Sequence, residues 1–373
     1  MSATRRTALV LYGDGSGRGD VQGGEGEDMR VARRRTFLPW GLGALAAVSL
    51  LVAGASARAA TQTSFSITYE SGGPADVKSA FNQATVRWSN LLRDPVTVKI
   101  AVGWEDLGPR VLGEAQFYVA YGDFNAVRDL VAGGGEAGDT REAALLPNIP
   151  TAAHLNLHLP TSYSFDGTGF LTTPNWKALG GSYPGTDGTI TFSSKFSWDY
   201  DPSNGITAGT YDMVGVATHE IGHFLGFMSG IDGIDYYMQY GVSPYKDWKP
   251  DDVWVSVLDL FRFDTSDLGA GFNFTTTARD LTPGGSQSFY YGDGSVLMST
   301  GAYKGDGYQG SHWKDFLLSL GILDPTAAPG ELLAIGQNDL IALDLIGWDV
   351  VPEPATLALV ALGGLFILRR RRA

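Results

Sequence analysis

Residues 215–230 read GVATHEIGHFLGFMSG, and this stretch decides the fold of the chain. His219 and His223 stand four residues apart with Glu220 between them, the HExxH spacing that places two imidazoles on one helix face. Apolar residues recur at steps of three and four and predict a helix over 211–227, with the histidines side by side off the apolar stripe formed by Val214, Ala217, Ile221, Phe224, Leu225 and Met228. Gly226 can end this helix at a left-handed cap, so a sharp turn is expected there.

The residue types in this helix indicate metal chemistry. Two histidines do not complete a catalytic zinc site, which usually has three protein ligands and one open position for water. The chain has no cysteine, so a further ligand must be His, Asp or Glu. We expect Zn2+ to be held by His219, His223 and a third residue, with Glu220 as the general base that takes a proton from the zinc-bound water.

Carboxylates offer one set of candidates for the third ligand. No glutamate occurs between Glu220 and Glu331, which disfavours a glutamate ligand soon after the helix. The segment 230–241, GIDGIDYYMQYG, holds Asp232 and Asp235 and superficially resembles the aspartate-bearing segment of the aspzincins. Asp232 or Asp235 is therefore the alternative third ligand.

Histidines offer the other candidates. His154 and His158 are expected on one face of a strand over 152–160, where side chains four residues apart lie roughly 13 Å from each other. That separation is too large for one metal ion. The remaining histidine is His312 in GYQGSHWKD, 89 residues after His223.

Two short segments together resemble a known family. HEIGHFLGF (219–227) and GSHWKD (310–315) are similar to the leishmanolysin branch of the metzincins, in which a long insertion separates the helix-ending glycine from a third histidine in a Ser-His-Trp context. The resemblance covers residues 145–350 and implies that His312 is the third zinc ligand. With the C-terminal tail described below, the chain resembles the PEP-CTERM metalloproteases of exported bacterial proteins.

Two positions depart from the usual metzincin pattern. Ser229 stands six residues after His223, where the compact form of the motif has His or Asp, although Gly226 is in its place. Metzincins also carry a methionine in a turn beneath the metal, and the segment LGILDPT (320–326) offers Leu323 there. Leucine has a volume similar to that of methionine and can fill the same floor.

The periodicity along the chain, read with the resemblance, predicts an α+β fold. Strands are expected at 63–72, 95–104 and 188–194, and helices at 74–92, 124–132 and 337–349. The resemblance implies a metzincin-like zinc peptidase domain over 60–350, with a mixed sheet, the active-site helix and a loop-rich C-terminal subdomain. GTITF (188–192) is the candidate edge strand for pairing with an extended peptide.

The N-terminal segment has the pattern of an export signal. Residues 29–59 combine an arginine-rich start, an apolar run from Trp40 and small-residue cleavage sites ending at Ala57 and Ala59. RRTFL (34–38) also resembles a twin-arginine signal, and the general secretory route stays open. We expect Met29 to be the true start, so that residues 1–28 are an extension that the translated protein lacks.

The C-terminal segment 351–373 resembles the PEP-CTERM sorting signal of Gram-negative bacteria. Pro-Glu-Pro at 352–354 precedes an apolar run of 14 residues and four arginines. The run is shorter than the roughly 20 residues of a membrane-spanning helix, and the arginines should stay cytoplasmic. We expect transient membrane insertion through both ends, recognition by an exosortase-type sorting enzyme, and a final location in the periplasm, on the cell surface or in the extracellular matrix.

Charge and motif together narrow the function. Residues 61–350 hold 15 Lys and Arg against 34 Asp and Glu, which excludes nucleic acid as an expected partner. We predict an exported zinc-dependent endopeptidase that acts on polypeptides. The alternative is a catalytically silent matrix or surface protein that binds a partner through a metalloprotease-like fold, and hydrolysis of a non-peptide amide is a third interpretation.

Overall fold

The computed structural model of the chain describes residues 7–8, 10–11, 62–70, 72–242, 250–316 and 318–351. The predicted signal peptide, most of the predicted extension 1–28 and the sorting tail from residue 352 onward lie outside these residues. Among the described helices, none combines the length and the apolar character that a membrane crossing requires. The two ends that are predicted to insert into the membrane lie outside the described residues.

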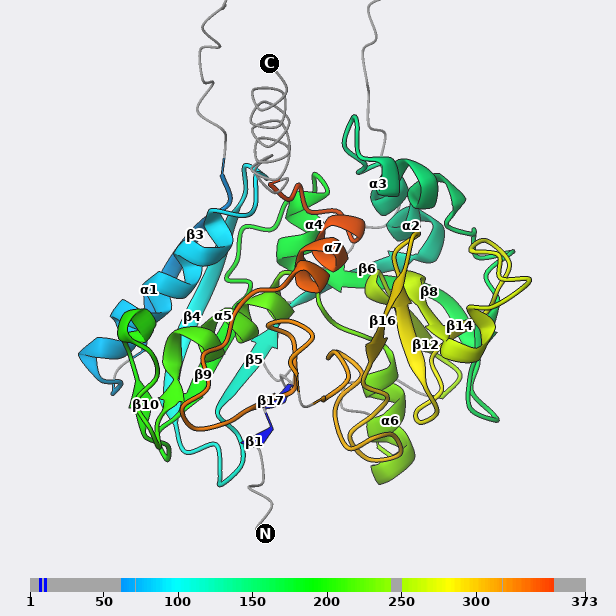
Figure 1. The fold of residues 1–373 in the computed structure, drawn as a ribbon. Helices are drawn as coiled ribbons and strands as arrows, with labels where there is room; N and C mark the ends of the chain where they lie inside the picture. The colour runs from blue at the N-terminus through cyan, green and yellow to red at the C-terminus, as the bar shows by residue number, and fades with distance from the viewer. Residues whose placement is uncertain are drawn as a thin grey trace, which may run out of the picture. The chain divides into compact units, whose positions relative to one another are not determined.

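A five-stranded mixed sheet lies in the first half of the domain (Figure 1). Its strands are β2 (Val10–Leu11), β3 (Ser64–Tyr69), β4 (Thr97–Glu105), β5 (Gly113–Phe117) and β9 (Gly188–Ser193). The spatial order is β2, β5, β9, β4, β3, in which β3, β4 and β9 are parallel and β5 is antiparallel to β9. The predicted strands at 63–72, 95–104 and 188–194 are confirmed.

The prediction that GTITF (188–192) is an edge strand is wrong. β9 lies between β5 and β4, since Ile190 pairs with Ala115 on one side and with Val102 on the other. Its alternating threonines resemble the solvent-facing positions of an edge strand, yet hydrogen bonds fill both sides. The strand beyond it is β5, whose sequence GEAQF is too short and polar for the hydrophobic pattern to reveal.

The remaining strands form small sheets. One joins β6 (Val119–Asp123), β8 (Phe165–Thr172) and β12 (Val253–Ser256), and another joins β13 (Arg262–Asp264), β15 (Gln287–Tyr290) and β16 (Ser295–Met298). Short pairs are β1 (Thr7–Ala8) with β17 (Thr326–Ala327), β10 (Trp198–Asp199) with β11 (Tyr211–Asp212), and β7 (Leu157–His158) with β14 (Arg279–Asp280). Together with the helices, these sheets confirm the α+β class.

The predicted strand over 152–160 is largely wrong. Only Leu157 and His158 are in a strand, and His154 lies in a turn with its Nδ1 2.9 Å from Thr151 Oγ1. Hydrogen bonds that a Ser or Thr side chain makes within a turn offer the chain an alternative to strand pairing. His154 and His158 therefore do not share a strand face.

The helices predicted at 74–92, 124–132, 211–227 and 337–349 are confirmed, and the described residues contain three further helices that were not predicted. They are α1 (Ala75–Ser89), α2 (Phe124–Ala132), α3 (Thr140–Leu145), α4 (Thr173–Ala178), α5 (Met213–Phe224), α6 (Ile231–Tyr240) and α7 (Gln337–Leu345). Single 3-10 turns occupy 146–148, 202–204, 258–261 and 265–267. α1 begins directly after Pro74, as expected for a residue that fixes its own φ and lacks an N–H.

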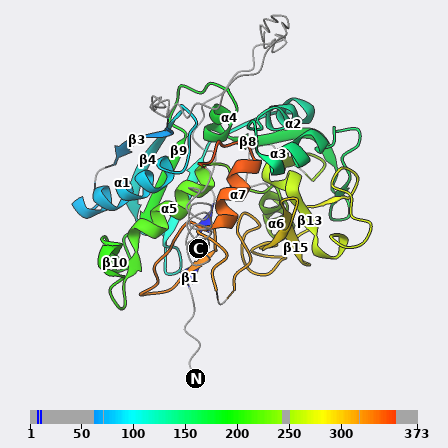
Figure 2. The same cartoon turned by 45° about the horizontal axis from the view of Figure 1, so that its top comes forward.

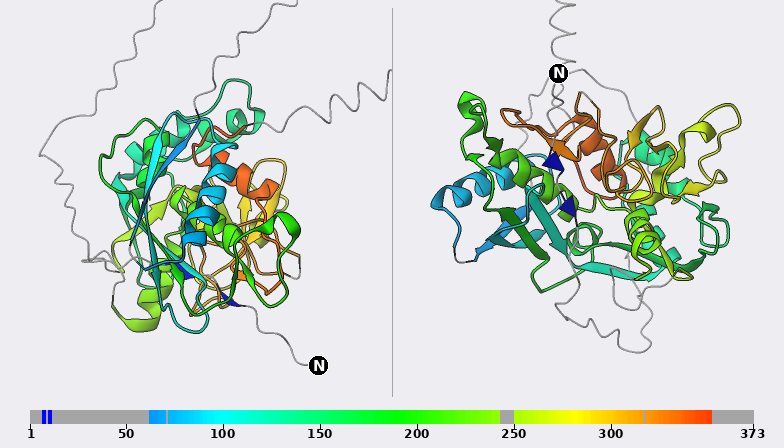
Figure 3. Two further views of the ribbon diagram at one scale, coloured as in Figure 1. Left: turned by 90° about the vertical axis from the view of Figure 1, so that its left-hand side faces the viewer. Right: turned by 90° about the horizontal axis from the view of Figure 1, so that it is seen from below.

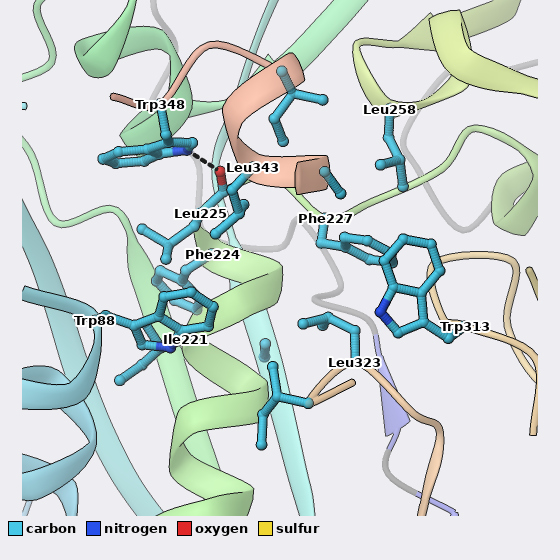
Figure 4. Close-up of a cluster of buried hydrophobic side chains, with 14 of the residues drawn as sticks. Trp88, Ile221, Phe224, Leu225, Phe227, Leu258, Trp313, Leu323, Leu343 and Trp348 are labelled. Atoms are coloured by element: carbon cyan, nitrogen blue, oxygen red, sulfur yellow. Dashed lines mark hydrogen bonds between the residues drawn. The ribbon is translucent and has the colours of Figure 1, made fainter. Parts of the chain in front are cut away.

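Helix α5 lies at the centre of the domain, between α1 and α7 (Figures 2 and 3). All of its residues are buried, so it is a core helix and not a surface helix with one apolar stripe. Asp212 caps its start by accepting the N–H of Gly215 at 2.8 Å. Trp88 of α1 donates its indole N–H to the Thr218 carbonyl at 2.9 Å. Figure 4 shows the apolar side chains that hold α5 against its neighbours.

Buried carboxyl groups make the stability of the domain depend on pH. Burial raises the pKa of Asp344 to about 8, helped by the nearby Glu142 carboxylate, and burial raises the pKa values of Asp94 and Glu142 to about 7. An acid whose folded-state pKa is raised stabilises the fold fully below its unfolded-state pKa of about 4, and this contribution is lost progressively as pH rises to the folded-state values of 7 to 8. The buried histidines His219, His223 and His312 oppose this trend only below about pH 7.5, because there the unfolded state alone takes up their protons.

We therefore expect the melting temperature to fall between pH 7.5 and pH 9. Scanning calorimetry at several pH values measures the slope, and the Asp344→Asn variant serves as the matched comparison. That variant should show a shallower slope, because one carboxyl group no longer loses its proton. A melting temperature that rises with pH over this range would contradict the expectation.

Candidate metal centre

Two histidines meet on one side of α5. His219 and His223 are one helical turn apart, and their Nε2 atoms lie 2.9 Å from each other. Both side chains are fully buried. The sequence spacing alone produces this pair, because residues four apart lie above one another on a helix.

The chain then turns sharply, as Gly226 predicts. Gly226 has φ +115°, a backbone conformation that favours glycine. The turn brings the carbonyl of Phe227 to His223 Nδ1, at 2.8 Å. The same glycine therefore ends α5 and orients one of its imidazoles.

The third histidine reaches this pair from 89 residues away. His312 Nε2 lies 3.3 Å from His219 Nε2, and the ring of His312 is buried. The ligand atoms of His219, His223 and His312 all lie within 4.8 Å of one another. Among the described residues, these three form the one group of three or more His, Asp or Glu side chains gathered closely enough to hold a metal ion.

The second ring nitrogens fix the tautomers. The Nδ1 atoms of His219, His223 and His312 lie 2.7, 2.8 and 3.2 Å from the backbone carbonyls of Ile322, Phe227 and Gln309 respectively. A carbonyl oxygen can only accept, so each Nδ1 carries the proton and each Nε2 presents a lone pair. The three Nε2 atoms therefore face one another with no hydrogen between them, an arrangement that a cation at its centre would stabilise.

The spacing of these nitrogens fits zinc. Ligand nitrogens at 2.0–2.1 Å from a tetrahedral zinc ion lie about 3.3 Å apart. The separations of 2.9 and 3.3 Å from His219 Nε2 are close to that value. Three neutral imidazoles with backbone partners on the far nitrogen are also the donor set and outer support that protein zinc sites use. His219, His223 and His312 thus fit a zinc ion.

Burial keeps the three imidazoles neutral. It lowers the pKa of His223 to about 4 and lowers the pKa values of His219 and His312 well below their ordinary value. The neighbouring rings lower the pKa values of His219 and His312 further, because a second positive charge would be repelled. The neutral ring is the form that binds a metal ion.

Glu220 directly follows the ligand candidate His219 in α5, and its carboxylate has no hydrogen-bond partner among the described residues. Both of its oxygens are buried, and no donor within the described chain reaches either of them. Burial raises the pKa of Glu220 well above its ordinary value, and the nearby Glu114 raises it further. A buried carboxylate without donors is costly to ionise unless a cation stands near it. Helix α5 therefore carries two histidines of a group that could hold a metal ion and also a buried carboxylate without a hydrogen-bond partner.

The floor of the centre is formed by the segment 321–323. The leucine at the predicted position of the metzincin methionine, Leu323, is fully buried and lies against α5, where a Cβ added to Gly222 would be 2.9 Å from Leu323 Cδ2. Figure 4 shows Leu323 between α5 and Trp313. The carbonyl of the preceding Ile322 accepts the Nδ1–H of His219. This segment therefore supports the helix and orients a histidine.

A buried aspartate that the sequence did not single out organises this floor. Asp339 in α7 accepts four N–H groups: the indole of Trp313 at 2.7 Å and the backbones of Ile322, Leu323 and Gly336 at 2.7, 3.3 and 2.7 Å. It thereby joins the residue after His312 to the residue whose carbonyl holds His219. In the sequence, Asp339 resembles any polar residue in the first turn of a helix.

The alternative ligands Asp232 and Asp235 lie elsewhere. The carboxylate of Asp232 accepts the backbone N–H groups of Gly310 and Ser311, at 2.5 and 3.1 Å. Asp235 accepts the N–H groups of Tyr303 and Lys304, at 2.8 and 2.7 Å. Asp232 thus holds the residues directly before His312, Asp235 holds residues 303–304, and neither joins the histidine group.

Comparison with known proteins identifies the tail. Residues 350–372 match the PEP-CTERM protein-sorting motif. This motif marks an exported protein of Gram-negative bacteria and implies recognition by an exosortase-type sorting enzyme, as predicted. No curated protein and no solved structure matches the chain.

Proposed function

We propose that this protein is an exported zinc-dependent endopeptidase. The observation that carries the proposal is the convergence of three unprotonated Nε2 atoms, two of them on the helix that also carries a buried carboxylate with no partner. His219, His223 and His312 would hold the ion, and a bound zinc ion lowers the pKa of a coordinated water to about 7 and polarises a carbonyl group. The sorting motif directs the protein to the periplasm, the cell surface or the extracellular matrix.

Glu220 would perform the proton transfers. Its carboxylate accepts no hydrogen bond from the described residues, so it can take a proton from the attacking water and pass it to the nitrogen of the leaving amine. A raised pKa suits a base that must later act as an acid near neutral pH. The surrounding protein excludes water, which strengthens the interaction between the carboxylate and a cation at the histidines.

The polypeptide would bind along β5. This strand lies next to α5, and its Gly113 is in contact range of the Glu220 carboxylate. Val10 and Leu11, which belong to the extension that we expect the translated protein to lack, pair with Glu114 and Ala115. This edge of β5 can therefore pair with a backbone segment and would be open without the extension. Pairing of an extended peptide with a sheet edge gives affinity through main-chain hydrogen bonds. We therefore propose β5, in place of GTITF (188–192), as the strand that pairs with an extended peptide.

Chelation tests the proposal directly. Cleavage of casein by the purified full chain should stop on treatment with 1,10-phenanthroline and return when zinc is added in excess of the chelator. The alternative of a silent binding protein predicts no cleavage in either state. Cleavage that persists in the chelator would exclude a metal-dependent mechanism.

Gly113 offers a test of the base that leaves the metal ligands untouched. A Cβ at position 113 would lie 2.9 Å from Glu220 Oε1 and 3.1 Å from Val216 Cγ1, so Gly113→Ala must displace the carboxylate. A shift of about 1 Å in a catalytic group can lower the rate by about 100-fold. We expect casein cleavage to fall by about 10- to 100-fold with zinc content unchanged.

The matched control is Gly122→Ala in β6. A Cβ at position 122 meets nothing within 4 Å, so this variant should cleave casein at the wild-type rate. Zinc content measured on the same samples separates loss of the base from loss of the metal. Equal rates for Gly113→Ala and Gly122→Ala would place the reacting water away from the Glu220 carboxylate.

A further inference from the structure

The segment that follows α5 forms a docking place for the segment that carries His312. Ser229 donates its backbone N–H to Ser311 Oγ at 2.8 Å. Ser311 Oγ in turn donates to Asp232, and the N–H groups of Gly310 and Ser311 also donate to the Asp232 carboxylate. Ser229, Asp232 and Ser311 are all buried. Residues 229–232 thus bind residues 310–311 directly before the third histidine.

Residues 310–311 are also bound from a second side, by Arg262. Arg262 donates an Nη2–H to the Gly310 carbonyl, and its Nη1 donates to Gln287 Oε1 at 2.7 Å. Arg262 is fully buried, and Asp259 lies 3.4 Å from its Nε. A Cβ at position 310 would overlap the Ile231 side chain, so only glycine allows this close approach.

Ser229 connects the end of α5 to the segment that carries His312. Ser229 stands six residues after His223, where the compact motif would place its own ligand. In this chain that residue contacts Ser311, which is adjacent to His312. The distant histidine is therefore delivered next to the position from which a nearby ligand would have come.

We propose that Asp232 is the positioning residue that fixes His312 in the metal centre. This inference rests on the proposed zinc site and adds a role for a residue that is not a ligand. Both Asp232 oxygens already accept donors from Gly310 and Ser311, so the carboxylate is committed to the loop. Without the carboxylate, the N–H groups of both residues lose their acceptor. Zinc binding then has to offset the conformational entropy that is lost when the loop becomes ordered.

Zinc affinity, measured by competition with a chromophoric chelator, tests the proposal on the purified full chain. Asp232→Asn should bind zinc about 10- to 100-fold more weakly than the wild type, the usual effect of losing a residue that orients a ligand. Asp235→Asn is the matched control, because Asp235 lies on the same helix and holds Tyr303 and Lys304 instead. Its zinc affinity should stay within about threefold of wild type, since only losses of tenfold or more are typical of orienting residues.

A double-mutant cycle shows whether Asp232 acts through His312. In the His312→Ala background, Asp232→Asn should cause no further loss of zinc affinity, because the histidine that it orients is gone. The visible spectrum of the cobalt-substituted Asp232→Asn protein should keep the intensity of a three-histidine site. Ser311→Ala, which removes one contact and keeps Asp232, should give a smaller loss in the same direction if Asp232→Asn fails to fold.

Two results would overturn the inference. One is wild-type zinc affinity in both Asp232→Asn and Ser311→Ala, and the other is a full loss from Asp232→Asn that persists in the His312→Ala background, as for a direct ligand. A wild-type chain that binds no zinc would overturn it as well. Tight zinc binding without any peptide cleavage would remove the proposed peptidase function and leave the role of Asp232 standing.

Discussion

Replacing Glu220 by Gln is expected to lower the rate of peptide hydrolysis by about 10²- to 10⁴-fold, the contribution of a general acid–base group. Glutamine has nearly the same volume and cannot accept the proton of the attacking water. Zinc content should stay at the wild-type level, because the ligands are His219, His223 and His312. Rates of casein cleavage and zinc content, measured on the same samples, test both parts.

The zinc-free form of Glu220→Gln provides a second, independent readout. Both carboxylate oxygens of Glu220 are buried without a partner, so removing the charge should leave the melting temperature unchanged or raise it. Glu70→Gln is the matched control, since Glu70 is an exposed acid directly after β3 and has no place in the proposed chemistry. If both variants cleave casein at the wild-type rate, Glu220 is not the base.

Replacing Asp339 by Asn is expected to destabilise the domain by about 2–4 kcal/mol, because at least one buried N–H group loses its acceptor at about 1–3 kcal/mol each. The amide nitrogen of Asn would face donors from Trp313, Ile322 or Gly336. The segments that hold His219 and His312 should loosen together. Urea unfolding measures the loss of stability, and chelator competition measures the accompanying loss of zinc affinity.

Asp344→Asn is the control for this prediction. Asp344 lies in the same helix, but burial and neighbouring carboxylates raise its pKa to about 8, so its charge is unfavourable. The change should be neutral or stabilising at pH 8. Equal stability of Asp339→Asn and wild type would show that the four hydrogen bonds to Asp339 do not support the centre.

The local half of the site could be predicted from the sequence. The spacing of His219, Glu220 and His223 determines their arrangement on any helix, and Gly226 predicts the turn after it. These features depend on residues within one or two helical turns. The starts of α1 and α7 were predicted to within one residue, whereas the predicted helices 74–92 and 337–349 end three and four residues too late.

The distant half depends on tertiary contacts. Only the family resemblance indicated His312, because its place depends on the docking of Gly310 and Ser311 onto Asp232, 78 and 79 residues earlier in the chain. Asp339 was missed because its four donors come from three separate segments. The edge strand was misplaced because alternation of residue types does not reveal the hydrogen-bonding neighbours that place β9 inside the sheet, between β5 and β4.

The most direct test of the central claim is the zinc content of the purified full chain, wild type beside His312→Ala, with X-ray absorption at the zinc edge. We predict one zinc ion per wild-type chain with nitrogen ligands at about 2.0–2.1 Å, and loss of the ion in His312→Ala. A wild-type chain without zinc, or a His312→Ala chain with the same zinc content and the same ligand shell, would contradict the three-histidine centre.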